Sequence, residues 1–229
     1  MINGILFDLD GTLLEHRTAA DTAIGAWVSE RAPGNPRLGE AAALWAALEE
    51  PHLAAWHAGE CSWQEQRRRR LRALCAELAI EPPADLDAAF AEFTGHYRRG
   101  WTAFADAAAA LAALDGFRIG VLTNGAQEIQ EEKVRAIGLE GRVGRVLTGE
   151  VLGGCYKPAE ACYTAAAAAL GLPPREVLLV GDDIVNDVTG PAATGMRSVW
   201  LDRLGTSPAP EGFPRITTLT ELPSLLSTL

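Results

Sequence analysis

Residues 2–13 of the chain are INGILFDLDGTL, an apolar run that ends abruptly in two acids, Asp8 and Asp10. The first six residues have the composition of a buried strand, and strand alternation puts Asp8 and Asp10 on the same side of the backbone. In an open parallel sheet, ligands bind at the carboxyl ends of the strands. Carboxylates this close repel each other unless a cation neutralises them or one keeps its proton. The stretch therefore favours a divalent-metal site, or a nucleophile beside an acid/base, over a simple Asp-Gly turn.

Composition and charge narrow the class of protein. The 229 residues are 48% hydrophobic and 22% charged, which suits one large α/β domain or a core with a smaller inserted domain. The formal net charge of −10 disfavours a nucleic-acid partner, whose phosphates need clustered Lys and Arg. The sequence shows neither a basic leader nor a membrane-spanning stretch, so we expect a cytoplasmic protein with no membrane partner. The four cysteines lack metal-binding spacing and are expected to be reduced.

The block between about residues 18 and 99 is expected to be helical. Its apolar residues recur at helical spacing, and it contains no convincing strand. Prolines and glycines divide the block into four predicted helices, at residues 18–31, 39–49, 63–78 and 85–99.

After residue 101 the pattern changes to alternating helices and strands. The predicted strands cover residues 118–122, 143–147, 177–180 and 198–201, and the predicted helices cover 105–114, 127–137 and 159–170. Such alternation gives parallel strands with helices on both faces. We therefore predict an α/β fold. A Rossmann-like, doubly wound parallel core would comprise residues 1–16 and 101–229, and an all-helical cap domain at 17–100 would act as a lid over it.

Two later segments supply further polar residues where apolar ones would pack better. Thr123 follows a predicted strand, and its hydroxyl could hold a phosphoryl oxygen together with the backbone amides at Asn124 and Gly125. A cap for the next helix explains Thr123 equally well. Lys157 lies beside Pro158, where proline is expected in the first turn of a helix. A lone lysine is usually a solvated charge, but it can also bind a phosphoryl group and separate two carboxylates.

The most apolar predicted strand ends in three acids, Asp182, Asp183 and Asp187. A capping turn accounts for one of them at most. Metal ligation accounts for the crowding, because Mg²⁺ takes oxygen ligands and keeps waters that neighbouring carboxylates can hold.

The order of these motifs resembles that of the haloacid dehalogenase superfamily. Asp-x-Asp-Gly-Thr-Leu, Thr-Asn-Gly, Lys-Pro and Gly-Asp-Asp follow one another, each at a strand end or a helix start. The long insertion after the first motif is similar to the helical cap of the superfamily's first cap class. The resemblance covers residues 8–196. It implies a Mg²⁺-dependent phosphohydrolase that cleaves a small phosphorylated metabolite through an aspartyl-phosphate.

The resemblance also implies the catalytic roles. Asp8 matches the nucleophile, and Asp10 matches the acid that protonates the leaving oxygen and then activates water as a base. Thr123, Asn124 and Lys157 match the residues that bind the phosphoryl group.

The metal ligands implied by the resemblance are the carboxylates of Asp8 and Asp182 and the main-chain carbonyl of Asp10. Asp187 matches an acid that supports them, through a metal-bound water or Lys157. Asp183 stands at a variable position, from which it supports the site or competes as a ligand.

Three alternatives share parts of this pattern. Sugar-phosphate mutases of this superfamily carry a histidine on the first cap helix. This chain has Ala20 at about that position, so the resemblance favours hydrolysis. A 2-haloacid dehalogenase needs no proton for its leaving halide, and Asp10 therefore disfavours it. A phospho-accepting signalling receiver has a shorter fold with no helical lid and places its lysine last, whereas Lys157 precedes Asp182 here.

The substrate is not identified by the sequence. Successive helix positions point about 100° apart, so the run of arginines at residues 67–70 cannot all face one way. At most Arg67 and Arg70 are expected to approach the active site.

Overall fold

In the computed structural model, which describes residues 1–205 and 210–228, six parallel strands form one sheet in the order β3-β2-β1-β4-β5-β6. The strands are β1 (Gly4–Phe7), β2 (Arg118–Leu122), β3 (Arg145–Leu147), β4 (Val177–Gly181), β5 (Arg197–Leu201) and β6 (Arg215–Ile216). β1 and β4 are buried along their whole length. This burial is typical of parallel strands that are covered by helices on both faces. The α/β parallel fold is confirmed.

The sheet continues one strand beyond the predicted set. We expected the last strand at residues 198–201, but β6 pairs with β5 through Trp200–Arg215 and Leu201–Ile216. A two-residue strand in a proline-rich segment has too little periodicity to be recognised, and its pairing with β5 defines it.

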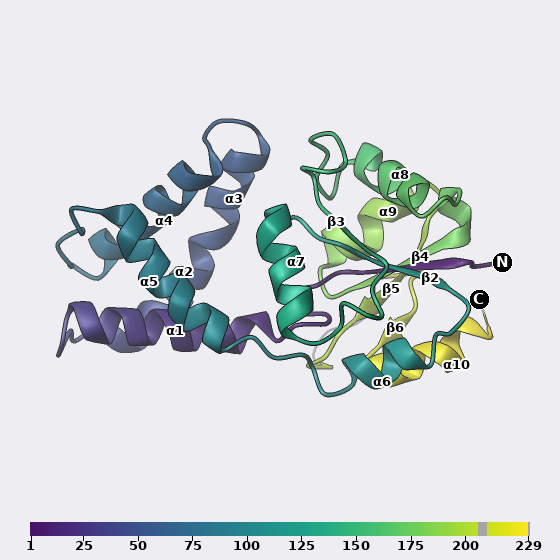
Figure 1. The fold of residues 1–229 in the computed structure, drawn as a ribbon, viewed down its shortest axis with the longest axis horizontal. Helices are drawn as coiled ribbons and strands as arrows, with labels where there is room; N and C mark the ends of the chain where they lie inside the picture. Colours follow the sequence, from purple (N-terminus) through teal and green to yellow (C-terminus); the bar gives the residue numbers. More distant parts are fainter. Residues whose placement is uncertain (206–209, 229) are drawn as a thin grey trace. The chain divides into compact units, whose positions relative to one another are not determined.

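Helices cover both faces of the sheet. α8 (Glu160–Ala169) and α9 (Gly190–Ala192) lie on one side, and α6 (Ala107–Ala112) and α10 (Leu222–Leu226) lie on the other (Figure 1). α7 (Gln127–Ala136) follows β2 and packs against β3. Leu6, Leu122 and Leu179 pack with residues of α8 in a buried core.

The chain divides into two compact units, residues 1–15 with 102–229 and residues 16–101. The predicted core also included residues 206–209 and 229, which lie outside the described residues. Two segments lead out of the sheet unit, and they run beside each other before they leave it. Leu14 bridges Ala103 in antiparallel fashion, and the amide of Glu15 donates to the carbonyl of Thr102 at 3.0 Å.

The helical unit contains α1 (His16–Arg31), α2 (Ala41–Ala47), α3 (Glu49–His57), α4 (Trp63–Glu77) and α5 (Leu86–Arg99). The other short helical segments in the described residues are Leu38–Glu40, Pro174–Glu176, Ile184–Thr189 and Leu219–Glu221.

The prediction of four helices here was wrong, because α3 was missed. The sequence pattern predicts a helix break at Pro51, but this proline is the third residue of α3. The N–H groups in the first turn of a helix have no intrahelical hydrogen-bond acceptor, so a proline there costs no hydrogen bond.

Arg70, expected to approach the active site, is instead buried inside the helical unit. Its Nη2 donates to the carbonyl of Trp45 at 2.8 Å and lies 3.3 Å from Glu49, and its guanidinium lies over the Trp45 ring. Arg67 lies over the Phe90 ring, with its charge centre 4.1 Å from the ring centroid. The guanidinium of Arg70 therefore stabilises this unit from within.

Substitutions in α3 test why Pro51 is tolerated. Pro51→Ala should leave the free energy of unfolding nearly unchanged, whereas Ala54→Pro, at an exposed position in the helix interior, should cost about 3 kcal/mol. Chemical denaturation monitored by circular dichroism measures both. Equal destabilisation by the two variants would contradict this explanation.

Candidate active site

The candidate site begins at the carboxyl end of β1, in the middle of the sheet. β1 pairs with β2 on one side and with β4 on the other, so the strand order reverses there. Such a reversal opens a crevice in which parallel sheets bind ligands. Asp8 follows β1 directly, and its amide donates to the carbonyl of Val180 at 2.9 Å. A ladder bond to the neighbouring strand thus fixes the backbone of Asp8.

Lys157 connects two buried acids. Its Nζ donates to Oδ1 of Asp8 at 2.8 Å and to Oδ1 of Asp187 at 2.6 Å. The side chains of Lys157 and Asp187 are almost fully buried, and that of Asp8 is 11% exposed. Gly181 makes room for this arrangement, because a β-carbon there would overlap the Asp187 carboxylate.

Burial and like charge shift the pKa values of the acids. Burial, and then the charges of Asp187 and Asp182, raise the pKa of Asp8 despite the opposing effect of Lys157. Burial also raises the pKa of Asp187. For Lys157, burial alone would lower the pKa, but the charges of Asp187 and Asp8 outweigh it and raise the pKa. Lys157 therefore stays an ammonium ion at neutral pH.

Asp8, Asp182 and Asp187 form a cluster that could hold a divalent cation. One carboxylate oxygen from each lies within 4.8 Å of the others. Partial desolvation and the charge of Asp187 raise the pKa of Asp182 to about 6, although Asp182 keeps access to solvent. Asp8 and Asp187 are buried with a single ammonium, that of Lys157, and the solvent-accessible Asp182 adds a third carboxylate. The three acids therefore carry more negative charge than Lys157 can balance. Carboxylate oxygens are the ligands that a hard cation requires, so the cluster fits such an ion.

The loop after β1 fixes the position of Asp182. The hydroxyl of Thr12 donates to Oδ1 of Asp182 at 3.1 Å. Gly11 has a φ of 96° and faces the same carboxylate, which a β-carbon at residue 11 would overlap. The glycine in the first motif is thus required both by its conformation and by the close approach of Asp182.

Asp183 has a different local role. Its Oδ1 accepts from the amides of Val185 at 2.9 Å and Asn186 at 2.7 Å, so it caps the π-helical segment Ile184–Thr189. Its carboxylate is not part of the acid cluster. A capping carboxylate is already engaged by backbone donors, which favours Asp182 over Asp183 as a ligand.

Thr123 and Asn124 follow the carboxyl end of β2, the strand that pairs with β1. Thr123 is buried, and the N-cap residue of α7 is Ala126, with no side-chain cap, so Thr123 does not cap that helix. The Asn124 side chain donates to the carbonyl of Lys157 and accepts from its amide, both at 2.8 Å. Asn124 therefore holds the backbone of Lys157 in place, and its side chain is less suited to bind a phosphoryl group than we expected.

Asp10 is held by a residue that the sequence reasoning missed. Lys133 Nζ donates to Oδ1 and Oδ2 of Asp10, at 2.8 and 2.6 Å. Lys133 lies on α7, between the Thr-Asn-Gly and Lys-Pro motifs, where we expected an ordinary helix. One signal in the sequence could have indicated it, because Lys133 and Lys157 are the only lysines in the chain.

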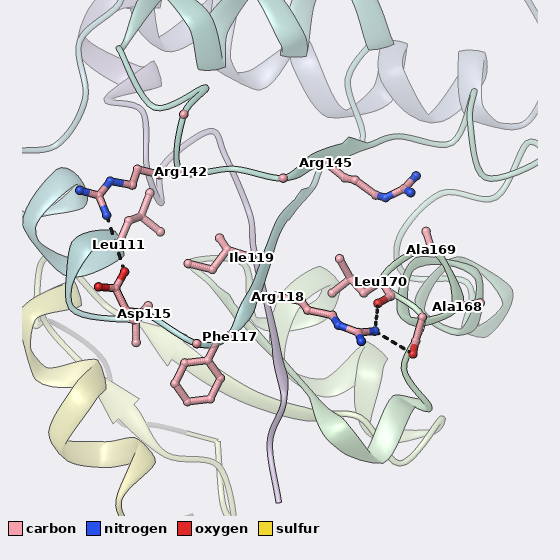
Figure 2. A pocket seen from close by; sticks show the side chains of 15 residues that line it. Leu111, Asp115, Phe117, Arg118, Ile119, Arg142, Arg145, Ala168, Ala169 and Leu170 are labelled. Atoms are coloured by element: carbon pink, nitrogen blue, oxygen red, sulfur yellow. Dashed lines mark hydrogen bonds and ion pairs between the residues drawn. The ribbon is translucent and has the colours of Figure 1, made fainter.

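A hollow of about 640 Å³ in the described residues contains none of the predicted site residues. It is lined by residues at the start of β2 and β3, including Arg118 and Arg145 (Figure 2). Arg118 Nη1 donates to the carbonyls of Leu170 and Gly171 at 2.7 and 3.0 Å. The hollow therefore lies at the amino ends of strands, opposite to the end where the acids gather.

A family model for haloacid dehalogenase-like hydrolases matches residues 2–195, which includes every residue of the acid cluster. The chain is a haloacid dehalogenase-like hydrolase. It is 32% identical to a phosphoserine phosphatase of Thermus thermophilus, over 92% of each chain. It is 29% identical to a ribulose-1,5-bisphosphate 5-phosphatase of Halopiger xanaduensis, over 100% of this chain and 97% of that protein.

Solved structures of haloacid dehalogenase-like hydrolases share the fold over nearly the whole chain. A hydrolase of this type from Bacillus subtilis, bound to magnesium, matches with a TM-score of 0.80 at 22% identity, over 98% of both chains. The L-2-haloacid dehalogenase of Xanthobacter autotrophicus matches with a TM-score of 0.80 at 23% identity, over both entire chains. No helix in the described part of this hydrolase is long and apolar enough to cross a membrane.

The raised pKa of Asp182 predicts how a cation stabilises this hydrolase at different pH. An acid whose folded-state pKa is raised binds its proton more tightly when folded, so its ionisation lowers stability as pH rises from about 4 through about 6. A divalent cation binds the ionised form and offsets this loss. Addition of MgCl₂ should therefore raise the Tm more at pH 7.5 than at pH 5.

Differential scanning fluorimetry with MgCl₂ or EDTA measures this difference. Asp182→Asn should reduce the pH dependence of the Tm increase, and Asp183→Asn, a matched change outside the cluster, should keep it. An equal increase at both pH values in the unmodified protein would contradict the assignment.

Proposed function

We propose that this protein is a Mg²⁺-dependent phosphohydrolase that cleaves a small-molecule phosphomonoester through an aspartyl-phosphate on Asp8. One observation supports this most directly: the buried ammonium of Lys157 bridges Asp8 and Asp187 at the reversal point of the sheet. The two full-length relatives named above are both phosphatases of small phosphorylated metabolites, which supports the same substrate class.

Asp8 is the proposed nucleophile. Lys157 holds Oδ1, and we assign the attack on phosphorus to Oδ2. As the new O–P bond forms, the bond from phosphorus to the leaving oxygen breaks, and Asp10 gives its proton to that oxygen. Lys157 remains charged throughout and offsets negative charge on the phosphoryl group.

Hydrolysis of the aspartyl-phosphate completes the cycle. Asp10, now a carboxylate, takes a proton from a water molecule as the water attacks phosphorus. The bond between phosphorus and Asp8 breaks, and inorganic phosphate leaves. Asp10 thus returns to its protonated form, and Asp8 returns to its carboxylate.

Mg²⁺ would be held by the carboxylates of Asp8 and Asp182 and by the main-chain carbonyl of Asp10, with Asp187 in support. When bound, it neutralises the acid cluster so that an anionic phosphate can approach. Thr123, Lys157 and the backbone amides at Asn124 and Gly125 are the proposed phosphoryl-binding groups, since oriented amides in such a turn favour anions.

The helical unit is proposed to act as a cap that selects the substrate and excludes water. Mutase-like members of the superfamily carry a histidine on the first cap helix at about the position where α1 has Ala20. Ala20 of α1 is buried and carries only a methyl group, so hydrolysis is favoured.

Product release distinguishes phosphatase from dehalogenase chemistry. With MgCl₂, the protein should release phosphate from members of a panel containing phosphoserine, phosphosugars, phosphoglycolate and nucleoside monophosphates, and EDTA should abolish the release. It should release no chloride from L-2-chloropropionate. Chloride release without phosphate release would overturn the proposed function.

Substitution of the paired acids tests the covalent mechanism. Asp8→Asn removes the nucleophile, so turnover should fall to background. Asp10→Asn leaves Asp8 able to attack an ester with a good leaving group, but hydrolysis of the phosphoenzyme should slow by about 10² or more for want of a base. With p-nitrophenyl phosphate and a rapid acid quench, intact-protein mass spectrometry should show one added phosphoryl group on Asp10→Asn and none on Asp8→Asn. Full turnover by Asp8→Asn would mean that water attacks directly.

A further inference from the structure

Lys133 makes a two-point contact with the proposed acid/base. Its Nζ donates to both carboxylate oxygens of Asp10, at 2.8 and 2.6 Å. The Lys133 side chain is 4% exposed, whereas that of Asp10 is 26% exposed. The contact therefore fixes Asp10 from its protein side and leaves its other side open to solvent.

Lysine is rare in this chain, and both lysines contact acids of the first motif. Of the 20 basic residues in the sequence, only Lys133 and Lys157 are lysines, and both are buried. One contacts Asp10 and the other contacts Asp8. Exposed ion pairs such as Arg31 with Glu92 and Arg68 with Asp87 use arginine. A compact ammonium with rotatable donors suits a small buried space better than the planar guanidinium does.

The inward face of α7 is polar where an apolar stripe is usual. Gln130, Lys133 and Val134 are its buried residues, and Gln130 and Lys133 are one turn apart. A β-carbon at Gly125 would overlap the Gln130 amide, so Gln130 lies against the turn of the Thr-Asn-Gly motif. α7 therefore reaches the site at two points, the phosphoryl-binding turn and Asp10.

We propose that Lys133 is a positioning residue that holds the Asp10 carboxyl group in the orientation for proton transfer. The inference rests on the proposed function of this site. A protonated carboxyl group has one oxygen that can still accept from Lys133, and its hydroxyl oxygen is then directed to the leaving group. After the proton has moved, both oxygens can accept from Lys133 again, as they do in this structure. Lys133 thus keeps Asp10 in place through both half-reactions and never contacts the phosphoryl group.

Lys133→Met tests the proposal, because methionine has similar length and no charge. Replacing a buried cation by an apolar side chain of similar volume need not unfold a protein, although the Asp10 charge loses its partner. Arg135→Met is the matched control, since Arg135 is an exposed cation on the same helix, 3.6 Å from Glu140. Lys133→Arg is the conservative variant and should recover part of the activity.

Two substrates of similar shape distinguish protonation of the leaving oxygen from the other steps of the reaction. Phenyl phosphate needs its leaving oxygen protonated, whereas p-nitrophenyl phosphate does not. Lys133→Met should lower kcat/KM for phenyl phosphate at least about tenfold more than for p-nitrophenyl phosphate. It should also lower kcat for both, with phosphoenzyme accumulating. A loss equal for both substrates in kcat/KM, without phosphoenzyme, would show that the residue is merely structural and would overturn the proposal.

A double-mutant comparison tests whether Lys133 acts through Asp10. In the Asp10→Asn background, adding Lys133→Met should change turnover less than about twofold, because the group that it positions is already disabled. Multiplication of the two single losses would contradict the proposal.

A third measurement is independent of catalysis. Protein labelled with [ε-¹³C]lysine should give two lysine signals, and Lys133→Met identifies one by its loss. Asp10→Asn should shift the Lys133 signal and leave the Lys157 signal in place, and Arg135→Met should shift neither. If the unmodified protein hydrolyses no phosphomonoester, the proposed function fails. The spectra then decide the Lys133–Asp10 contact on their own, and an unchanged Lys133 signal in Asp10→Asn overturns it.

Discussion

The structure of the site depends on a buried ammonium ion between two buried carboxylates. Lys157 makes it possible for Asp8 and Asp187 to lie together beneath the surface, since each alone would be neutralised by burial. Residues of neighbouring elements hold Lys157 and Asp187 in place. Gly181 gives Asp187 its space, and the Asn124 side chain fixes the backbone of Lys157 at both its amide and its carbonyl. Strands β2 and β4 and the loop that contains Lys157 thus meet around Asp8.

The remaining charge determines the chemistry. One ammonium cannot balance Asp8, Asp187 and the partly solvated Asp182, so the cluster favours a divalent cation. A bound cation would in turn favour an anionic substrate. Asp10 stands outside this cluster and has its own cation, Lys133. The two acids of the first motif, only two residues apart, are therefore held in separate electrostatic environments. That separation is what a nucleophile and an acid/base require, because the same local field cannot suit both roles.

The two units of the chain divide the protein's physical tasks. Inside the sheet unit, charges converge on the carboxyl ends of the strands. Inside the helical unit, the most buried cation, Arg70, is used for packing against Trp45 and Glu49. The sequence suggested that Arg70 could approach a substrate, because its helix position alone does not show which neighbour its side chain will meet.

The sequence by itself determined the parallel α/β class, most strand positions and the acids at their ends, because buried strands and the polar residues that interrupt them are local patterns. It could not place α3, since only the position of Pro51 within its turn shows that the proline is harmless. It also could not show that Asp183 caps a helix while Asp182 joins the cluster, because adjacent acids look alike until the backbone direction is known. The tertiary structure alone decided the contact between Lys133 and Asp10. These residues are 123 positions apart, and an ordinary surface helix would show the same local pattern as α7. Long-range pairing of this kind depends on how β1 and the helix after β2 pack, and no local pattern records it.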